Sequence, residues 1–233
     1  MNYDEYVTTV SELAVIVPPS TDFLAILPNA IDYTELRIQR DLDLLATVSS
    51  NTTFALTANT RAITFTEGTF VTIQNVNILT PVGTSNPNAA TRNPCLPVAK
   101  EVLDYTWPSS AGAAIPSQFA MFNQNTLYFG PWPDMGYTVE LVGTVRFTPL
   151  STTNTTNFLS LYFADLYVQA SMIYISQYQR QFGAAANDPQ MPGSYEMQYQ
   201  TLLKSAEVEE QRKKFASTAW TSQSPSPVAT PTR

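Results

Sequence analysis

The sequence contains no histidine, one cysteine and only eight glycines in 233 residues. Without histidine, neither a Ser-His-Asp nor a Cys-His catalytic group can form, and the commonest metal ligand is missing. The single cysteine, Cys95, excludes an internal disulfide and is typical of a small buried thiol. Neither GxxxxGK[ST] nor GxGxxG occurs, so nucleotide binding has no support. We therefore expect no enzymatic activity, no metal and no cofactor.

Positive charge is also scarce. The net charge of −7 falls mainly on residues 1–48, which hold eight carboxylates and two arginines. Residues 49–150 carry four basic and five acidic residues, and residues 151–233 carry six of each. Because a protein that grips phosphates needs a basic surface, tight or sequence-specific nucleic-acid binding is not expected. The composition still allows an acidic channel wall past which DNA slides.

Long uninterrupted apolar runs are absent as well. The segment Phe158–Ile175 has nearly the length of a membrane span, but Asp165, Gln169 and two serines interrupt it and no basic residues flank it. The first ten residues are acidic and polar, where a signal peptide needs a basic start and an apolar run. We expect neither a membrane segment nor a secretory signal.

The sequence does hold enough apolar material for a core, because 44% of its residues are hydrophobic. Residues 157–182 would form a helix that is apolar on nearly every side, and such a helix is buried. We expect it to be the central helix, capped by Thr156 or Asn157 and ended by Gly183. Helices of this chain, and of neighbouring copies, would surround it.

Helices are also predicted on both sides of the middle of the chain. We expect helices over 4–17, over 23–27 after a cap at residues 20–22, and from Pro28 to about Ala46. A last helix would begin at Ser194 and bury one face. That face comprises Tyr195, Tyr199, Leu202, Leu203 and Ala206. The carboxylates Glu207, Glu209 and Glu210 would lie on its solvated side. We interpret the basic cluster Arg212, Lys213 and Lys214 as a solvated helix end, which suits the helix dipole, in preference to a phosphate contact.

Residues 49–150 have a different character. They are rich in Thr, Val, Ile and Phe and contain turn residues, which predicts a compact antiparallel β unit. The proline-rich segment 80–97 is expected to be a loop, and residues 100–107 either a strand or a helical turn. A hairpin is predicted across residues 123–125, followed by a strand over 137–147. The carboxylates Asp104, Asp134 and Glu140 lie in this unit at no diagnostic spacing.

The last residues, 216–233, are polar and proline-containing and cannot build a core. We expect an extended arm with Trp220 as its anchor, because a lone aromatic side chain in a polar arm can fill a pocket of a partner. The predicted docking residues are Trp220, Pro225, Pro227, Val228 and Arg233.

The predicted fold class is therefore α+β. An antiparallel helical bundle, formed by residues 1–48 and 151–215, would carry an inserted antiparallel β-sandwich or barrel-like domain at 49–150 and the arm at 216–233. Helices around a β insertion, no catalytic residues and an adhesive tail are typical of a structural assembly protein.

One segment resembles a known family. Residues 27–46, LPNAIDYTELRIQRDLDLLA, are similar to the opening helix of the head-to-tail adaptor (connector) proteins of tailed bacteriophages. The matching positions are Leu27, Pro28, Ile31, Glu35, Arg37, Ile38, Arg40, Asp41 and Leu42. The C-terminal half is also similar, with a Tyr/Leu/Ala-rich helix, a loop with Asp and Pro, and a helix that opens YEMQYQTLL and closes with basic residues.

This resemblance implies a ring, usually of twelve copies, beneath the portal protein at the capsid vertex of the virion, after assembly in the host cytoplasm. The ring would extend the channel for double-stranded DNA and present a surface to a tail or nozzle protein, or to a tail fibre. The C-terminal arm would dock onto the portal. The candidates for residues that face the channel are Asp32, Glu35, Asp41 and Asp43; their negative charge would keep DNA from adhering.

A second function stays open. The β unit would then be a binding module for carbohydrate or for fibre docking, with the helices as its mount. Trp107 and Trp132 are the candidates for stacking on sugars, although core or loop packing is the favoured interpretation of each.

Overall fold

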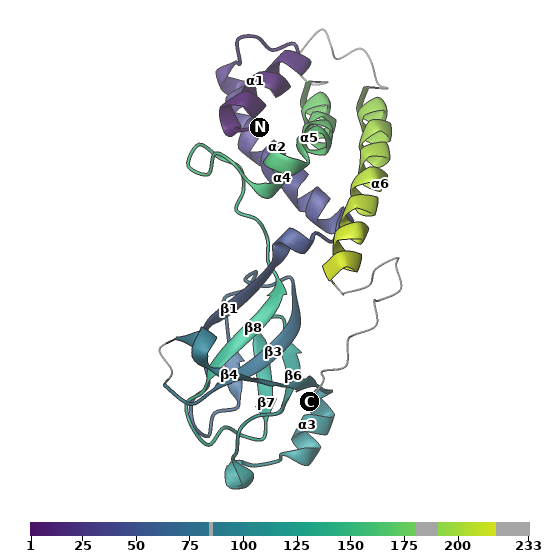
Figure 1. The fold of residues 1–233 in the computed structure, drawn as a ribbon. Coiled ribbons are helices and arrows are strands. Elements are labelled where there is room, and N and C mark those ends of the chain that lie inside the picture. Colours follow the sequence, from purple (N-terminus) through teal and green to yellow (C-terminus); the bar gives the residue numbers. More distant parts are fainter. Residues whose placement is uncertain (84–85, 180–190, 218–233) are drawn as a thin grey trace, which may run out of the picture. The chain divides into compact units, whose positions relative to one another are not determined.

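The computed structural model describes residues 1–83, 86–179 and 191–217. The chain forms two compact units (Figure 1). One unit combines Met1–Leu45 with the described residues that follow Arg146, and the other is Ala46–Arg146. The first is helical and the second consists mainly of strands, so the predicted α+β class is confirmed.

The helical unit is organised around one central helix, as predicted. Its helices are α1 (Tyr3–Leu13), α2 (Thr21–Asp41), α4 (Phe158–Tyr162), α5 (Ala164–Gln179) and α6 (Met191–Ser217). Helix α5 packs against each of the other four, and Figure 1 shows it between α1 and α6. Buried side chains occur on nearly all of its sides, among them Leu166, Tyr167, Ala170, Met172 and Ile175. Apolar burial of this extent is the main source of the unit's stability.

The central segment is not continuous, however. Asn157 caps α4, as expected, and forms a reciprocal capping box with Ser160. The chain then leaves helical geometry at Phe163, where φ is −127° and ψ is 42°. Tyr167 already bonds to the carbonyl of Phe163, so α5 starts its own hydrogen-bond ladder there. The interruption places the buried Phe163 ring against Phe158, with ring centroids 5.8 Å apart.

Helix α2 replaces the two helices predicted for residues 23–46. Ser20 caps it by accepting a hydrogen bond from the backbone N–H of Phe23, and Pro28 lies inside it. A proline inside a helix removes one backbone hydrogen bond. Phe23, Leu27 and Ile31 nevertheless continue one buried row across the proline, so burial outweighs the lost bond. The helix ends at Asp41, earlier than predicted, because its cap Leu42 is extended.

The two outer helices also differ in their bounds. Helix α1 ends at Leu13, not near residue 17, and the backbone turns at Val15 with φ of 58°. Helix α6 already includes residues 191–193, so Ser194 lies within it and is not its cap. It continues to Ser217, so the first two residues of the predicted arm are helical. Gly183 and residues 218–233 lie outside the described residues.

The β unit contains two four-stranded sheets. Its strands are β1 (Val48–Ala55), β2 (Ala62–Thr64), β3 (Thr72–Thr80), β4 (Thr91–Pro94), β5 (Leu96–Pro97), β6 (Gln118–Asn123), β7 (Thr126–Gly130) and β8 (Thr138–Thr144). The strand orders are β1-β8-β3-β4 and β2-β7-β6-β5. Pairing is antiparallel except between β5 and β6. Side chains of both sheets share one core, including Val76, Ile78, Phe119, Leu127, Phe129 and Val139. Among the described residues the sheets do not close into a barrel, so the sandwich alternative holds.

The hairpin predicted across residues 123–125 is present as β6 and β7. Residues 100–106 form a helix, α3, which settles the choice between strand and helical turn. The segment predicted as a loop, 80–97, instead contains the short strands β4 and β5. Both occupy sheet edges, where a proline with no N–H to donate is tolerated. Turn-like composition therefore concealed two edge strands.

Two smaller expectations concern Cys95 and membrane segments. Cys95 is a free, buried cysteine, as predicted, and burial raises the pKa of its thiol to about 12. Within the described ranges, no helix has both the length and the apolar character that a bilayer crossing requires.

Candidate functional site

The four acidic residues predicted to face the channel occupy different environments. Glu35 is buried, with 3% of its surface exposed. Its Oε1 atom accepts hydrogen bonds from the backbone N–H of Leu150 at 3.0 Å, from Asn157 Nδ2 at 2.7 Å and from the Tyr167 hydroxyl at 2.9 Å. Burial raises the pKa of this carboxyl, and the three hydrogen bonds lower it less. Glu35 therefore joins α2 to the chain that returns from the β unit and offers no charge at a surface.

The other three acidic residues are exposed. Asp41 accepts a hydrogen bond from the Tyr199 hydroxyl at 2.7 Å, and Asp43 is paired with Lys214. Helix α2 ends at Asp41, so Asp43 lies beyond the helix in the segment that leads to the β unit. Asp32 is exposed on α2 itself. Only Asp32, Asp41 and Asp43 thus remain candidates for an acidic surface.

Arg37 links α2 to α6. Its Nη2 atom lies 2.6 Å from Glu196 Oε1, its Nε atom lies 3.6 Å from Asp41 Oδ2, and its guanidinium lies 4.4 Å from the centre of the Tyr199 ring. The hydrogen bond from Arg37 holds the pKa of Glu196 below its ordinary value. A guanidinium that is both paired and stacked is well ordered, so this network fixes how α6 lies along α2.

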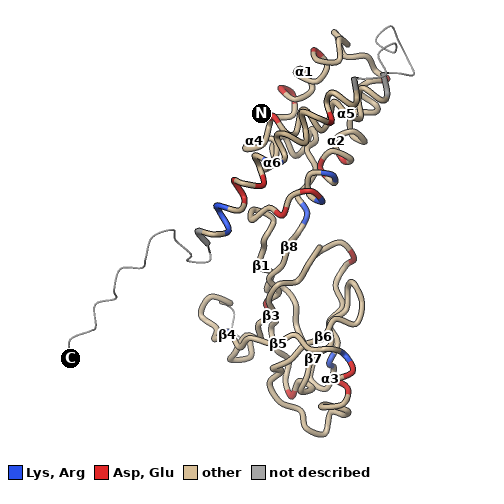
Figure 2. The backbone as a smooth tube through the Cα atoms, turned by 90° about the vertical axis from the view of Figure 1, so that its right-hand side faces the viewer, with Lys and Arg blue, Asp and Glu red and all other residues tan. Residues whose placement is uncertain are grey.

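The basic cluster at the end of α6 is mostly occupied within the chain. Lys213 contacts Glu209 at 2.6 Å and Glu210 at 2.8 Å, and lies over the rings of Phe158 and Phe163. Lys214 pairs with Asp43, as noted above, whereas Arg212 is exposed. Figure 2 shows acidic residues of α6 followed directly by basic residues toward the end of this helix. The arrangement favours the helix-end interpretation over a phosphate site.

Glu210 was expected on the solvated side of α6 but is buried, with 3% of its surface exposed. Its Oε2 atom accepts a hydrogen bond from the backbone N–H of Leu45 at 3.0 Å. The spacing of the buried positions Tyr199, Leu203 and Ala206 continues to position 210, so helical periodicity contained the signal. The charge of a glutamate side chain, in contrast, predicted a solvent-exposed position.

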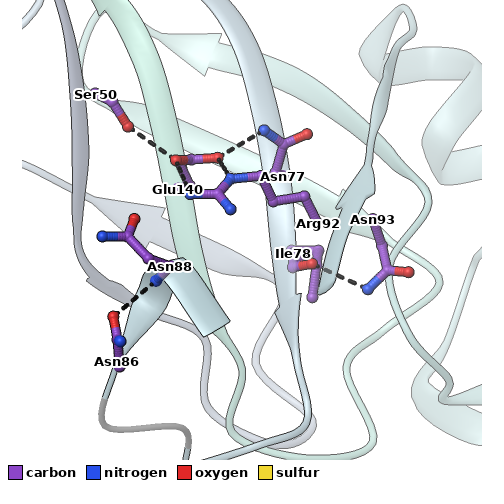
Figure 3. Close-up of polar contacts among 8 residues, drawn as sticks. All are labelled: Ser50, Asn77, Ile78, Asn86, Asn88, Arg92, Asn93 and Glu140. Carbon is purple, nitrogen blue, oxygen red and sulfur yellow. Dashed lines mark hydrogen bonds and ion pairs between the residues drawn. The ribbon is translucent and has the colours of Figure 1, made fainter. Parts of the chain in front are cut away.

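In the β unit, polar side chains converge on Glu140 (Figure 3). Arg92 binds both carboxylate oxygens, with Nε 2.9 Å from Oε2 and Nη2 3.2 Å from Oε1. Asn77 donates to Oε2 at 2.8 Å and Ser50 to Oε1 at 3.0 Å. Burial raises the pKa of Glu140, but the bonds from Arg92, Asn77 and Ser50 outweigh it, so the pKa lies below its ordinary value. The cluster ties together strands β1, β3, β4 and β8.

Three carboxylates of the β unit, Asp104, Asp134 and Glu140, do not form one group. Asp104 pairs with Arg61 at 2.7 Å and with Lys100 at 2.6 Å, whereas Asp134 accepts a hydrogen bond from the Tyr137 hydroxyl at 2.6 Å. Glu140 belongs to the separate cluster described above. Across residues 1–83, 86–179 and 191–217, no three histidine, cysteine or acidic residues are grouped closely enough to hold a metal ion.

Both tryptophans proposed to stack on sugars are partly buried and bonded within the chain. Trp107 Nε1 donates to Gln118 Oε1 at 3.2 Å, and Trp132 Nε1 donates to the carbonyl of Trp107 at 3.1 Å. The Arg61 guanidinium lies 5.2 Å from the centre of the Trp132 ring. This geometry is that of side chains packed within the chain.

The β unit does have an open apolar groove. The lining residues are Ile73, Pro97, Val98, Ala99, Lys100, Glu101, Phe119, Met121 and Phe122. Phe122 is 50% exposed and stacks on Tyr128, with ring centroids 4.9 Å apart. Tyr105 is 89% exposed on α3, whose N-terminal residues line the groove. An exposed group of aromatic and aliphatic side chains is typical of a protein-binding surface.

We expect Arg92→Met to destabilise the β unit by about 1 kcal/mol, a modest value because the Arg92 side chain is 40% exposed to solvent. The change removes two donors from Glu140, and the pKa of that carboxyl should rise. A carboxyl with a lowered pKa stabilises the fold above its unfolded pKa and loses this contribution as the pH falls through its folded pKa. Acid unfolding of the variant should therefore begin at a higher pH.

Tryptophan fluorescence in a Trp220→Phe background measures this unfolding, because Trp107 and Trp132 both lie in the β unit. Arg146→Met is the control, since Arg146 is exposed. If Arg92→Met and Arg146→Met unfold at the same acid midpoint, Arg92 does not lower the pKa of Glu140.

The whole chain was compared with known proteins. A sequence profile of the SU10 adaptor protein family matches residues 1–228, which span both compact units. No curated protein matches the sequence. The family is one of phage adaptors, and its role is structural. The predicted resemblance is thus confirmed, and the chain belongs to the SU10 adaptor protein family.

Proposed function

We propose that the protein forms a ring beneath the portal at the capsid vertex, extends the DNA channel and joins the head to the tail of the virion. The observation that carries the proposal is the family match over residues 1–228, because it includes both units and most of the C-terminal arm. The copies would assemble in the host cytoplasm, and we expect twelve copies in the ring.

The distribution of charge supports a channel role for the helical unit. Residues 1–48 carry eight carboxylates and two arginines, and Asp32, Asp41 and Asp43 are exposed. Negative charge on a channel wall repels the phosphate backbone, so DNA passes without adhering. Glu35 takes no part in this proposal because it is buried.

The β unit supplies a surface for the tail side. Its open groove and the exposed residues Tyr105, Met121 and Phe122 provide apolar area next to the charged Lys100 and Glu101. Such a surface suits a tail or nozzle protein, or a tail fibre, better than a carbohydrate. The packed tryptophans give no support to the alternative of a sugar-binding module.

The arm at residues 218–233 is assigned to the portal by its sequence. It follows α6 directly and holds Trp220, Pro225, Pro227, Val228 and Arg233. Prolines restrict an unbound chain, so less conformational entropy is lost when such a segment binds in an extended form. A lone tryptophan is the residue most suited to anchor it in an apolar pocket.

Deleting residues 218–233 should abolish docking onto the portal while leaving both units folded. Native mass spectrometry of the portal mixed with the protein should show a multiple-copy addition for the full chain and none for the deletion. A chain with the same arm residues in scrambled order controls for length and composition. Full occupancy of the portal by the deleted chain would refute the role of the arm, and absence of binding by the full chain would refute the adaptor proposal.

A further inference from the structure

Helix α6 buries one face within its own unit and carries exposed apolar residues on the other side. Tyr199, Leu203 and Ala206 are buried, with exposed fractions of 0%, 7% and 5%. Met197 is 74% exposed and Val208 is 46% exposed. At about 100° per residue, Met197 and Val208 project in nearly the same direction, roughly opposite to the buried row. A solvated helix normally places polar residues there.

Two cations accompany the exposed apolar residues of α6. Lys204 and Arg212 are exposed and fall on the same side of the helix as Met197 and Val208. Within the described part of the chain, no carboxylate forms a salt bridge with either of them. We call Met197, Lys204, Val208 and Arg212 the outer stripe of α6. It combines apolar contact area with two positive charges that form no salt bridge to a described residue.

The complementary surface lies where α1 turns into α2. Leu13, Val15, Val17 and Leu24 are between 43% and 86% exposed there. The carboxylates Glu12 and Asp22 precede and follow this turn and are exposed. We call these six residues the α1–α2 corner. Residues 1–36 contain no lysine or arginine, so no basic residue of this segment offsets the two carboxylates.

The two surfaces lie on different sides of the helical unit. Helices α1 and α6 both pack on α5, and Figure 1 shows them on opposite sides of it. Two unlike patches on opposite sides of one subunit produce head-to-tail contacts, which close into a ring when the rotation between copies allows it. A patch that paired with itself would give a two-fold dimer instead.

We propose that the outer stripe of α6 in one copy binds the α1–α2 corner of the next copy. The inference rests on the proposed ring and identifies the surfaces that build it. Apolar side chains of the two surfaces pack together, and Lys204 and Arg212 face Glu12 and Asp22. The occupant of the stripe is thus a second copy of this chain and not the portal.

A charge exchange tests the proposal on the full chain, alone and with the portal. Lys204→Glu with Arg212→Glu should weaken assembly on the order of tenfold, since exposed attractive pairs become repulsive. Glu12→Lys with Asp22→Lys should weaken it similarly. A chain that carries all four substitutions should assemble again, because each interface regains opposite charges. Arg40→Glu with Glu67→Lys is the control for charge reversal elsewhere on the exposed surface.

Cross-linking identifies the contact itself. A carbodiimide joins amines to carboxylates that touch, and a mixture of isotopically light and heavy copies distinguishes links between copies from links within one. We expect peptides that join Lys204 of one copy to Glu12 or Asp22 of another. Links from Lys204 only to other carboxylates, or failure of the fourfold variant to recover although circular dichroism shows it folded, would overturn the inference.

The outcomes also separate this inference from the proposed function. Portal binding without these links removes the assigned interface and leaves the adaptor role intact. Rings with these links that ignore the portal keep the interface and remove the docking role. A chain that stays monomeric both alone and with the portal contradicts both.

Discussion

Glu35→Ala should lower the free energy of unfolding of the helical unit by about 3 kcal/mol, because three donors lose their shared acceptor. The backbone N–H of Leu150, the amide of Asn157 and the hydroxyl of Tyr167 all bond to one oxygen atom of Glu35. Tyr167 is fully buried, so its hydroxyl finds no water in the folded state. Urea unfolding followed by far-ultraviolet circular dichroism measures the loss.

Glu35→Gln is the matched variant. Since every one of the three bonds goes to Oε1, the carbonyl oxygen of glutamine, which has two lone pairs, replaces most of this acceptor. The variant should therefore stay within about 1 kcal/mol of the original protein at neutral pH. A glutamine variant as unstable as the alanine variant would show that the charge itself, and not the acceptor, holds the chain here.

The pH dependence provides a second test of the same site. Burial raises the pKa of Glu35 above its ordinary value of about 4.5. Between the unfolded and the folded pKa, the folded state binds a proton that the unfolded state has lost, so stability falls as the pH rises through this window. Below the window the contribution is fully present. Glu35→Gln cannot titrate, so it should remove this slope from the unfolding free energy.

Gly143→Ala should destabilise the β unit by about 3 kcal/mol or more, because an added methyl group has no space. Gly143 lies in β8 and pairs with β1 on one side and β3 on the other. An added Cβ would collide with the backbone oxygen of Thr72 and would lie 2.9 Å from a ring carbon of Phe70 and 3.2 Å from the Ile73 Cα. Backbone atoms of a paired strand cannot move aside as a flexible side chain can.

Gly112→Ala is the control for this substitution, because a Cβ at position 112 meets no atom within 4 Å. It should leave stability within about 0.5 kcal/mol of the original value. The tryptophan fluorescence of the Trp220→Phe background reports on unfolding of the β unit in both variants. If Gly143→Ala unfolds at the same urea concentration as Gly112→Ala, then β8 is not held between β1 and β3 as described.

The Glu35 site shows how the helical unit accommodates an inserted unit. The β unit interrupts the helical unit between Leu45 and Phe147, so the chain must return to the place it left. Glu35 secures that return at Leu150 and Asn157, directly before α4 begins. A fixed return keeps α5 and α6 in place relative to α2.

Local sequence patterns predicted the elements that depend on local chemistry. The apolar residues on all sides of 157–182 predicted a buried helix, and α5 is buried as expected. Asn157 caps α4 because its side chain reaches the N–H of Ser160, a contact within one turn. The β6–β7 hairpin likewise forms between adjacent segments. Where apolar residues continued across Pro28, however, the local helix-start signal was misleading.

Contacts between distant segments decided what the patterns could not. Chemical type favours solvent for Glu35, Glu140 and Glu210, yet all three are buried. Their partners lie far along the chain: Glu35 bonds to Tyr167, Glu140 to Ser50 and Glu210 to Leu45. The short strands β4 and β5 also exist only because β3 and β6 lie beside them.

The sequence by itself thus determined the class of the fold, the central helix and the family, because each depends on composition, on periodicity or on a local motif. Tertiary structure alone decided which carboxylates are buried and which face of α6 stays uncovered. A buried charge requires hydrogen-bond partners to offset its desolvation, and those partners are assembled only when distant segments pack.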